Sequence, residues 1–413
     1  MSSSGILVVG GGFSGITAAL EAAEVGHEVF IVEKNPFLGG RVAQLNKYFP
    51  KLCPPSCGLE IQFQRIKNNP KVKFFTLAEV TKITGGPGDY KVTVKIKPRY
   101  VGPGSVNLAE KAASLSRDVD SDFELGMGTR KALYMDVPFA FPNRYVLDKD
   151  NCAKGDLETL GAEDVIDLSD APKEITLEVG AIVYATGWKP YDVTNLTNLG
   201  AGSIKNCVSN MQLERLASPN GPTKGKITRP SDGRAPKSIA FVQCAGSRDE
   251  NHLNYCSYIC CMASLKQAAY VREQYPDARV TIYYIDLRTP GRYENFAKRI
   301  LNDPNIRTVK GKVAGAAEDI ATGNVILTVE DAVTGIKSDD KYEMVVLATG
   351  MQPSIAGQTL PVDVPVDEMG FIIGGEEKGV FAAGCAKSPL DVMKSAQSAT
   401  GAAMKAIQTV RGR

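Results

Sequence analysis

Four of the nine cysteines in the chain lie close together in the sequence, and they are the residues best suited to chemistry. Cys244, Cys256, Cys260 and Cys261 follow the pattern C-x11-C-x3-C-C. Four cysteine thiolates are a usual ligand set of a [4Fe–4S] cluster. Two other interpretations stay open: buried cysteines that serve as small apolar side chains, and a disulfide between the two adjacent cysteines. The polar residues among the cysteines favour the cluster.

The residues around these cysteines set further expectations. Cys261 cannot share one helical face with Cys256 and Cys260, so the segment is either irregular or leads into a helix that begins near Cys260. Free N–H groups at a helix start can donate to sulfur, and the helix dipole favours negative charge there. Arg248 and Lys266 are expected to offset more of the cluster's charge.

A second pair of cysteines, Cys53 and Cys57, lies on a proline-rich turn. Their C-x3-C spacing departs from the C-x4-C of the pyridine-nucleotide disulfide reductases, and the prolines argue against a helix. Three interpretations remain open: a redox-active pair, ligands to a cluster of a partner, and structural cysteines near a flavin.

A glycine-rich turn near the N-terminus predicts dinucleotide binding. Residues 5–9 have the character of a buried strand, a helix follows that should stop at Gly26, and a second strand ends in Glu33. In a GxGxxG turn the first glycine makes the bend, the second admits the pyrophosphate and the third lets the helix approach the strand. The acidic residue can accept hydrogen bonds from ribose hydroxyls.

Three further segments favour FAD over NAD. A glycine pair and an arginine follow the acid, a strand near the C-terminus ends in Gly384 and Cys385, and two Ala-Thr-Gly turns end apolar strands. The first of these segments resembles the second phosphate loop of flavoproteins with two dinucleotide folds. The second resembles their Gly-Asp element, with cysteine in place of aspartate, and the Ala-Thr-Gly turns resemble the points where the chain crosses between domains. The expected FAD contacts are Gly10, Gly12, Phe13, Ser14, Gly15, Glu33, Lys34, Gly40, Arg41, Val80, Ala185, Thr186, Gly187, Gly384 and Cys385.

The cysteines stand where a second dinucleotide turn would be expected. Residues 238–243 predict a buried strand, residues 259–274 a helix and residues 278–286 another strand. No GxGxxG occurs at this turn, so binding of NAD(P) here is disfavoured.

Composition excludes several classes of function. A net charge of +2 with interspersed acids and bases gives no reason to expect nucleic-acid binding. With only two histidines, a His-rich zinc or haem site is not expected. No apolar run is long enough to span a membrane, and the first residues lead into a strand without a signal peptide.

These patterns predict an α/β fold with two Rossmann-like domains of the thioredoxin-reductase type. The first, residues 1–190 with 346–413, would bind FAD and carry a polar insertion near 102–150. The second, residues 205–345, would hold the cluster. The polar part of the insertion, 102–130, is expected to be a surface excursion or a partner contact.

The motifs resemble those of the A subunits of heterodisulfide reductases. They lie at residues 10–15, 33–41, 213–233, 243–261 and 381–391. Residues 39–60 and the modest length resemble more closely the A subunits of the quinone-interacting membrane-bound oxidoreductase complexes of sulfate reducers. The larger relatives carry ferredoxin-type cysteines after a segment like 97–101, which this chain lacks, so one cluster is expected.

The resemblance implies an electron-transfer subunit that carries FAD and a [4Fe–4S] cluster. It would link menaquinol to adenylylsulfate reductase in dissimilatory sulfate reduction, and flavin-based bifurcation or confurcation belongs to the same expectation. The implied partners are adenylylsulfate reductase, a B subunit with flavin and clusters, and a haem-bearing membrane subunit. The implied location is the cytoplasmic side of the inner membrane, where partner subunits would hold the chain.

Three alternatives differ in class from this interpretation. The chain would be a subunit of another thiol or sulfur redox complex, a stand-alone NAD(P)H-dependent disulfide reductase that uses Cys53 and Cys57, or a scaffold that binds FAD without passing electrons.

Overall fold

The computed structural model describes residues 4–104 and 108–412. The chain divides into two compact units. Unit 1 comprises residues 1–44, 53–188 and 353–413, and unit 2 comprises 45–52 and 189–352. The expectations for a leader and for the segment 102–130 fall in part on residues 1–3 and 105–107, which lie outside the described residues.

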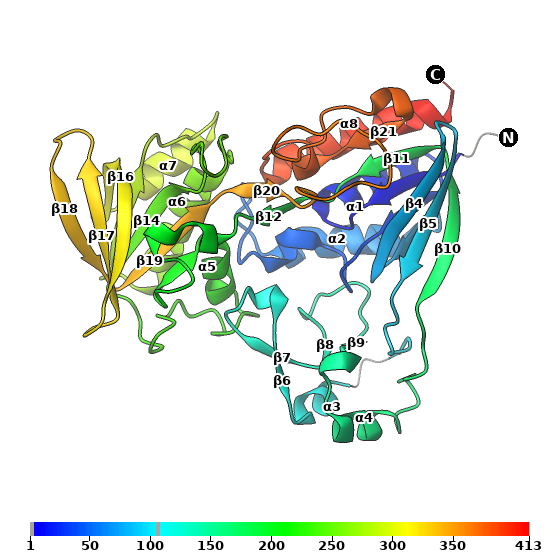
Figure 1. The fold of residues 1–413 in the computed structure, drawn as a ribbon, viewed down its shortest axis with the longest axis horizontal. Coiled ribbons are helices and arrows are strands. Elements are labelled where there is room, and N and C mark those ends of the chain that lie inside the picture. Colours follow the sequence, from blue (N-terminus) through cyan, green and yellow to red (C-terminus); the bar gives the residue numbers. More distant parts are fainter. Residues whose placement is uncertain (1–3, 105–107, 413) are drawn as a thin grey trace. The chain divides into compact units, whose positions relative to one another are not determined.

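Unit 1 is built on a parallel sheet in the order β21-β11-β1-β2-β3 (Figure 1). Helices α1 and α8 cover one face of this sheet, and α2 packs beside α1. An antiparallel sheet, β10-β5-β4, covers the other face. The bounds are β1 Ile6–Val9, α1 Phe13–Glu24, β2 Val29–Val32, α2 Pro55–Asn68, β3 Val72–Phe75, β4 Ala78–Gly86, β5 Asp89–Ile96, β10 Lys173–Val179, β11 Ala181–Tyr184, β21 Val380–Ala382 and α8 Val392–Val410.

Small side chains allow the two long helices of unit 1 to pack closely. Alanines of α1 and α8 are buried in one cluster with the apolar residues of β1 and β11. Every residue of β2 and β11 is buried, as expected for a parallel strand that is covered on both faces. The carboxyl ends of β1 and β11 are therefore held rigidly beside the first turn of α1.

The insertion of unit 1 has a hydrophobic core of its own beneath its polar side chains. Val101, Leu108, Leu115, Leu133 and Leu160 are buried in one cluster. The polar side chains form its outer surface, and its apolar segments are too short to show a regular pattern in the sequence. Its elements are α3 Ala109–Ser114, β6 Asp118–Asp120, β7 Thr129–Lys131, β8 Leu133–Tyr134, β9 Val146–Leu147 and α4 Lys154–Leu160.

Unit 2 is built on a sheet in the order β13-β19-β14-β15-β16-β17-β18. The first five strands in this order, β13, β19, β14, β15 and β16, pair in parallel. Strands β17 and β18 continue the sheet in antiparallel pairing. The chain passes between the units through β12 and β20. The bounds are β12 Trp188–Pro190, β13 Cys207–Ser209, α5 Asn210–Ala217, β14 Ser238–Ala245, α6 Cys260–Gln274, β15 Arg279–Tyr284, α7 Tyr293–Leu301, β16 Ile306–Asp319, β17 Asn324–Asp331, β18 Lys337–Tyr342, β19 Met344–Thr349 and β20 Met351–Pro353.

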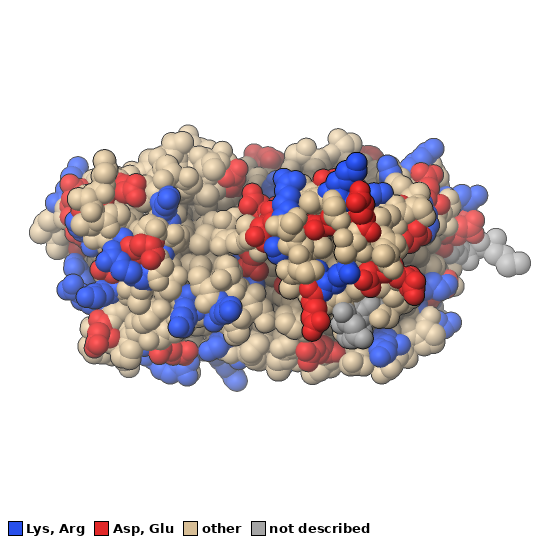
Figure 2. Space-filling view, turned by 90° about the horizontal axis from the view of Figure 1, so that it is seen from below, with Lys and Arg blue, Asp and Glu red and all other residues tan. Residues whose placement is uncertain are grey.

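The charged side chains form a mixed surface. On the face shown in Figure 2, Lys and Arg lie among Asp and Glu. Among the described residues, no helix is both long enough and apolar enough to cross a membrane.

Candidate functional site

The turn between β1 and α1 requires glycine at two positions. Gly10 has φ +107°, and a Cβ there would lie 2.4 Å from the carbonyl oxygen of Ala185. A Cβ on Gly15 would lie 1.8 Å from the carbonyl oxygen of Gly10. At Gly12 the nearest atom would be 3.7 Å away, so this position leaves room for a ligand. Gly12 also caps α1 without a side-chain hydrogen bond, which leaves backbone amides for an anion.

Glu33 is buried at the end of β2 and holds the glycine turn. Its Oε2 accepts from the Gly11 amide at 2.6 Å, and its Oε1 accepts from the Asn35 amide at 2.8 Å. Burial raises the pKa of this carboxyl, and the two amides oppose that shift. Each carboxylate oxygen has a second lone pair, so hydrogen bonds to ribose hydroxyls remain available.

The second phosphate loop packs directly on the first. The Gly39 amide donates to the carbonyl of Gly11 at 2.8 Å. Gly40 has φ +56°, and a Cβ there would lie 2.8 Å from the Cα of Gly12. Arg41 follows, half-buried, with its Nε 3.2 Å from the Trp188 carbonyl oxygen, and desolvation lowers its pKa. The structure thus brings the two loops together as a cradle.

Two more predicted segments reach this cradle. Gly384 has φ +61°, and a Cβ there would lie 2.1 Å from the Oγ of Ser14. At the turn after β11, the Ala185 amide donates to the Val9 carbonyl at 2.8 Å. The hydroxyl of Thr186 is buried and has no partner among the described residues. An unpartnered buried hydroxyl beside this turn fits a bound polar group such as FAD.

Three predicted contacts are placed differently. The thiol of Cys385 is buried and points to the Leu390 carbonyl oxygen at 3.5 Å, and burial raises its pKa. Val80 pairs with Val94 and packs against the core between the sheets. Lys34 is exposed. In the described residues these side chains serve packing or face solvent, so any contact with FAD would come from their backbones or from movement.

The four clustered cysteines lie in unit 2 at the carboxyl end of β14. This strand has β15 on one side and β19 on the other, and ligands of open α/β sheets bind where the chain order reverses in this way. Cys244 stands at a bulge at the end of β14 with φ +55°. Cys260 and Cys261 are the first residues of α6, which confirms the predicted helix start. No side chain caps this helix, so its first amides remain available to an anionic group.

The four thiols influence one another electrostatically. Burial raises the pKa of Cys244, Cys260 and Cys261. Negative charge on Cys256 would raise all three pKa values further, so the thiols are near enough to interact electrostatically. Cys244, Cys260 and Cys261 therefore keep their protons at neutral pH unless a metal displaces them.

Four cysteines are a donor set known for both structural zinc ions and [4Fe–4S] clusters. Among the described residues, no group of three or more His, Cys, Asp or Glu is arranged to hold one metal ion. A single zinc ion needs all its thiolates at about 2.3 Å from one point. A [4Fe–4S] cluster takes one thiolate on each iron and so needs a wider ring of sulfurs, all from cysteine.

Hydrogen bonds that the sequence did not reveal fix the cysteine loop. The hydroxyls of Ser247 and Ser257 lie 2.9 Å apart, and Ser257 also accepts from the Met351 amide at 2.9 Å. A Cβ on Gly350 would lie 2.3 Å from the Ser247 hydroxyl oxygen and 2.8 Å from that of Ser257. The Ala-Thr-Gly turn that ends in Gly350 was the only sequence signal of this contact.

The glycine at this turn is crowded on one side. Gly246 has φ +77°, and a Cβ there would lie 2.7 Å from the ring of Tyr191. The Tyr191 hydroxyl is 2.9 Å from Nδ1 of His252, which holds the ring in place. Tyr191 therefore covers the Cβ side of the one glycine in the turn.

The expectation for Lys266 was wrong. Its Nζ pairs with buried Glu214 at 2.9 Å and donates to the Lys47 carbonyl at 2.6 Å. Glu214 of α5 therefore neutralises the charge of Lys266, and the segment 45–52 supplies its second partner. Arg248 is placed as expected, because its positive charge lowers the pKa of the Cys244 thiol.

Cys53 and Cys57 lie at the start of α2. Pro55 is the first residue of this helix, and Cys57 is exposed in its first turn. The prolines predict a segment less helical than a redox pair prefers; Cys57 is nevertheless helical, because proline is well tolerated at the first helical position, whereas Cys53 precedes the helix. Cys53 is half-buried.

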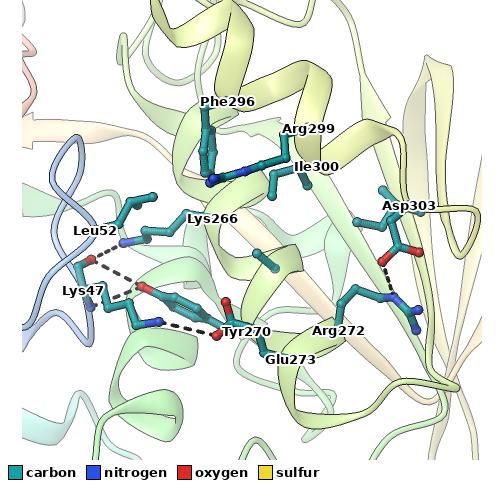
Figure 3. Close-up of a pocket in the computed structure, with 12 residues that line it drawn as sticks. Lys47, Leu52, Lys266, Tyr270, Arg272, Glu273, Phe296, Arg299, Ile300 and Asp303 are labelled. Atoms are coloured by element: carbon teal, nitrogen blue, oxygen red, sulfur yellow. Dashed lines mark hydrogen bonds and ion pairs between the residues drawn. The ribbon is translucent and has the colours of Figure 1, made fainter.

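A cavity of about 460 Å³ lies between α6, α7 and the segment 45–52 (Figure 3). Lys47 pairs with Glu273 at 3.4 Å, and Arg272 pairs with Asp303 at 2.7 Å. These lining charges are paired with one another, and none of the cysteines lines the cavity.

Comparisons with known proteins agree with this geometry. Residues 5–49 match the FAD dependent oxidoreductase family. The chain is 37% identical, over 97% of its length, to an iron-sulfur A subunit of the CoB–CoM heterodisulfide reductase of Methanopyrus kandleri, and covers 63% of that protein. It is 35% identical, over 98% of its length, to the A subunit of the H2:CoB-CoM heterodisulfide, ferredoxin reductase of Methanothermobacter marburgensis, and covers 64% of it. The chain thus spans less than two thirds of these relatives.

Solved structures confirm the predicted fold. The thioredoxin reductase of T. acidophilum superposes with a TM-score of 0.54 at 16% identity, covering 99% of this chain and 98% of the other. That of Lactococcus lactis gives 0.54 at 14% identity, covering 99% and 100%. At this identity the likeness concerns the fold alone.

Proposed function

Since the chain belongs to the family of heterodisulfide reductase A subunits, we propose that it is an electron-transfer subunit with FAD in unit 1 and a [4Fe–4S] cluster in unit 2. The observation that carries the proposal is the cysteine set at the carboxyl end of β14, where a nucleotide loop would otherwise stand. FAD exchanges electrons in pairs or singly, and a cluster exchanges them singly, so the two together form a relay.

The residues of the chain have separate tasks in this proposal. Gly12 and the first amides of α1 would receive the pyrophosphate, and Glu33 would orient the ribose while it holds the turn. Cys244, Cys256, Cys260 and Cys261 would each bind one iron. The covered glycine Gly246 would exclude a pyridine nucleotide, so electrons would come from and go to protein partners.

Cofactor content of the anaerobically purified full chain tests the proposal. We expect about four irons and about one FAD per chain. Cys244→Ser should lose most of the iron and keep FAD, whereas Cys152→Ser, which changes a cysteine in the insertion, should keep both. A wild-type chain without iron, or a Cys244→Ser variant with unchanged iron, would contradict the cluster.

The finer proposal concerns the partners. Likeness of residues 39–60 to the quinone-interacting complexes supports a B subunit with flavin and clusters, a haem-bearing membrane subunit, and a link from menaquinol to adenylylsulfate reductase. Affinity purification of the tagged chain from gently solubilised membranes should recover a haem-bearing subunit. Recovery only with a thiol or sulfur redox enzyme, and no haem, would instead assign it to another heterodisulfide reductase-like complex.

One observation favours a second candidate function, a disulfide reductase. Cys57 is exposed in the first turn of α2, with Cys53 close in sequence. This function requires that NADH or NADPH alone bleach the flavin and that Cys57→Ser abolish turnover. We expect no bleaching, because Tyr191 covers Gly246.

A further inference from the structure

Arg248 is held beside the cysteines by the fold. It has φ +58°, which is unusual for a side chain with a Cβ, and its amide donates to the Tyr255 carbonyl at 3.1 Å. Its guanidinium lies 2.9 Å from a carboxylate oxygen of Asp286, and its positive charge acts on the Cys244 thiol. The side chain is therefore fixed at both its backbone and its charged end.

Asp286 connects this arginine to a second cysteine. It follows β15, and its carbonyl oxygen lies 3.5 Å from the sulfur of Cys261. Its side chain is 51% exposed, whereas that of Arg248 is 25% exposed. The positive charge is therefore the more buried member of the pair.

The other lysine and arginine side chains near the cysteines differ in their partners. Lys266 lies on the same helix as two of the cysteines, but its charge is neutralised by buried Glu214. Arg288, in the same loop as Asp286, also lowers the pKa of the Cys244 and Cys261 thiols through its charge. Of these three, Arg248 has the largest effect on the pKa of Cys244, and its carboxylate partner is largely in solvent.

We propose that Arg248 sets the reduction potential of the cluster and that Asp286 both positions it and moderates its effect. This rests on the proposed function, because it requires a cluster at the four cysteines. One-electron reduction adds a negative charge to the cluster and breaks no bond. A fixed positive charge beside the cysteines stabilises the reduced form, so Arg248 raises the potential. Arg248 is thus a positioning and tuning residue rather than a ligand.

Two substitutions predict shifts of opposite sign. Arg248→Gln removes the charge and should lower the midpoint potential. Asp286→Asn keeps an oxygen for the guanidinium but removes the opposing charge, and should raise the potential. We expect Arg248→Gln to change the ratio of oxidised to reduced cluster at a fixed potential roughly tenfold, which for one electron corresponds to about 59 mV. Because its carboxylate is exposed and screened, Asp286→Asn should give a smaller shift.

Electron paramagnetic resonance during an anaerobic redox titration of the full chain measures these shifts. Arg248→Lys keeps the charge and should restore most of the potential. Lys312→Gln is the matched control, because Lys312 pairs at 3.5 Å with Asp249, the neighbour of Arg248, but is 74% exposed. It should leave the potential unchanged.

The outcomes separate this inference from the proposed function. Wild-type protein without iron would overturn both. Full iron content with an unchanged potential in Arg248→Gln, or a downward shift in Asp286→Asn, would overturn only the role of Arg248. Should Arg248→Gln lose iron during purification, the sign of the Asp286→Asn shift decides alone.

Discussion

The turn after β1 and the turn after β14 occupy equivalent places in two similar folds, yet they offer different chemical groups. In the first, Gly10, Gly12 and Gly15 bring backbone against backbone and leave amides open for phosphate. In the second, Cys244 and Cys260 bring thiols to the same edge of the sheet, and Tyr191 covers the one glycine. A strand end that faces a helix start can therefore suit either an anion or a cluster, according to its side chains.

The two helices that follow these turns are also supported differently. Helix α1 packs on α8 through alanines. Helix α6 is held to α5 by an ion pair between Lys266 and Glu214, both almost fully buried, with Gln267 donating to the same carboxylate at 2.7 Å. Close apolar packing suits a turn that must stay rigid to bind a dinucleotide. The ion pair instead fixes the position of a helix whose first turn carries thiols.

The largest effect on FAD binding should come from filling the first turn. In Gly10→Ala the new Cβ would lie 2.4 Å from the Ala185 carbonyl oxygen at φ +107°. Strain of about 1–3 kcal/mol and loss of the open backbone should weaken FAD binding roughly tenfold or more. Flavin absorbance per chain measures this. Gly155→Ala, where a Cβ meets open space, is the control and should bind FAD normally. Equal iron content in both variants would show that the turns act independently.

Breaking the ion pair under the second turn should destabilise the fold. Lys266→Met leaves the Glu214 carboxylate buried without its cation and should lower the free energy of unfolding by about 3–5 kcal/mol. Denaturant unfolding measures the loss. The double variant with Glu214→Gln should recover part of it. If the single variant also lowered the cluster potential as Arg248→Gln does, the distinction between the two cations would be wrong.

A smaller effect is expected from the anchor of the cysteine loop. Gly350→Ala places a Cβ 2.6 Å from the side chain of Leu253 and still closer to the Ser247 hydroxyl oxygen. We expect a loss of about 1–3 kcal/mol in stability and faster release of iron to a chelator. Unchanged iron release despite lower stability would mean that the anchor supports the fold only.

The smallest effect concerns the pH dependence of the first turn. Burial raises the pKa of Glu33 above 4.5, so the folded chain keeps a proton that the unfolded chain has lost. Its contribution to stability therefore falls as pH rises above 4.5 and levels off beyond the folded pKa. Unfolding of the FAD-free chain at a series of pH values should show this slope, and Glu33→Gln should flatten it. Glu60→Gln, which changes an exposed residue of α2, should leave it intact.

Most of the secondary structure around both turns could be predicted because it is local. The apolar run before Gly10 and the alanine-rich stretch after Gly15 predict a strand and a helix without reference to the rest of the chain. The insertion could not be predicted in this way, since its core joins short segments as distant as Val101 and Leu160. For the same reason Lys266 was misassigned, because its partner Glu214 lies on another helix.

Residue type and spacing were enough to indicate the chemistry that each turn can offer, because glycines at a strand end suit phosphate and clustered cysteines suit iron. Which groups meet could be learned only from the folded chain. Gly384 lies against Ser14, Tyr191 covers Gly246, and Arg248 contacts Cys244 while Lys266 pairs with Glu214. Most of these contacts join residues far apart in the sequence, and the packing of sheets and helices fixes them rather than any local preference.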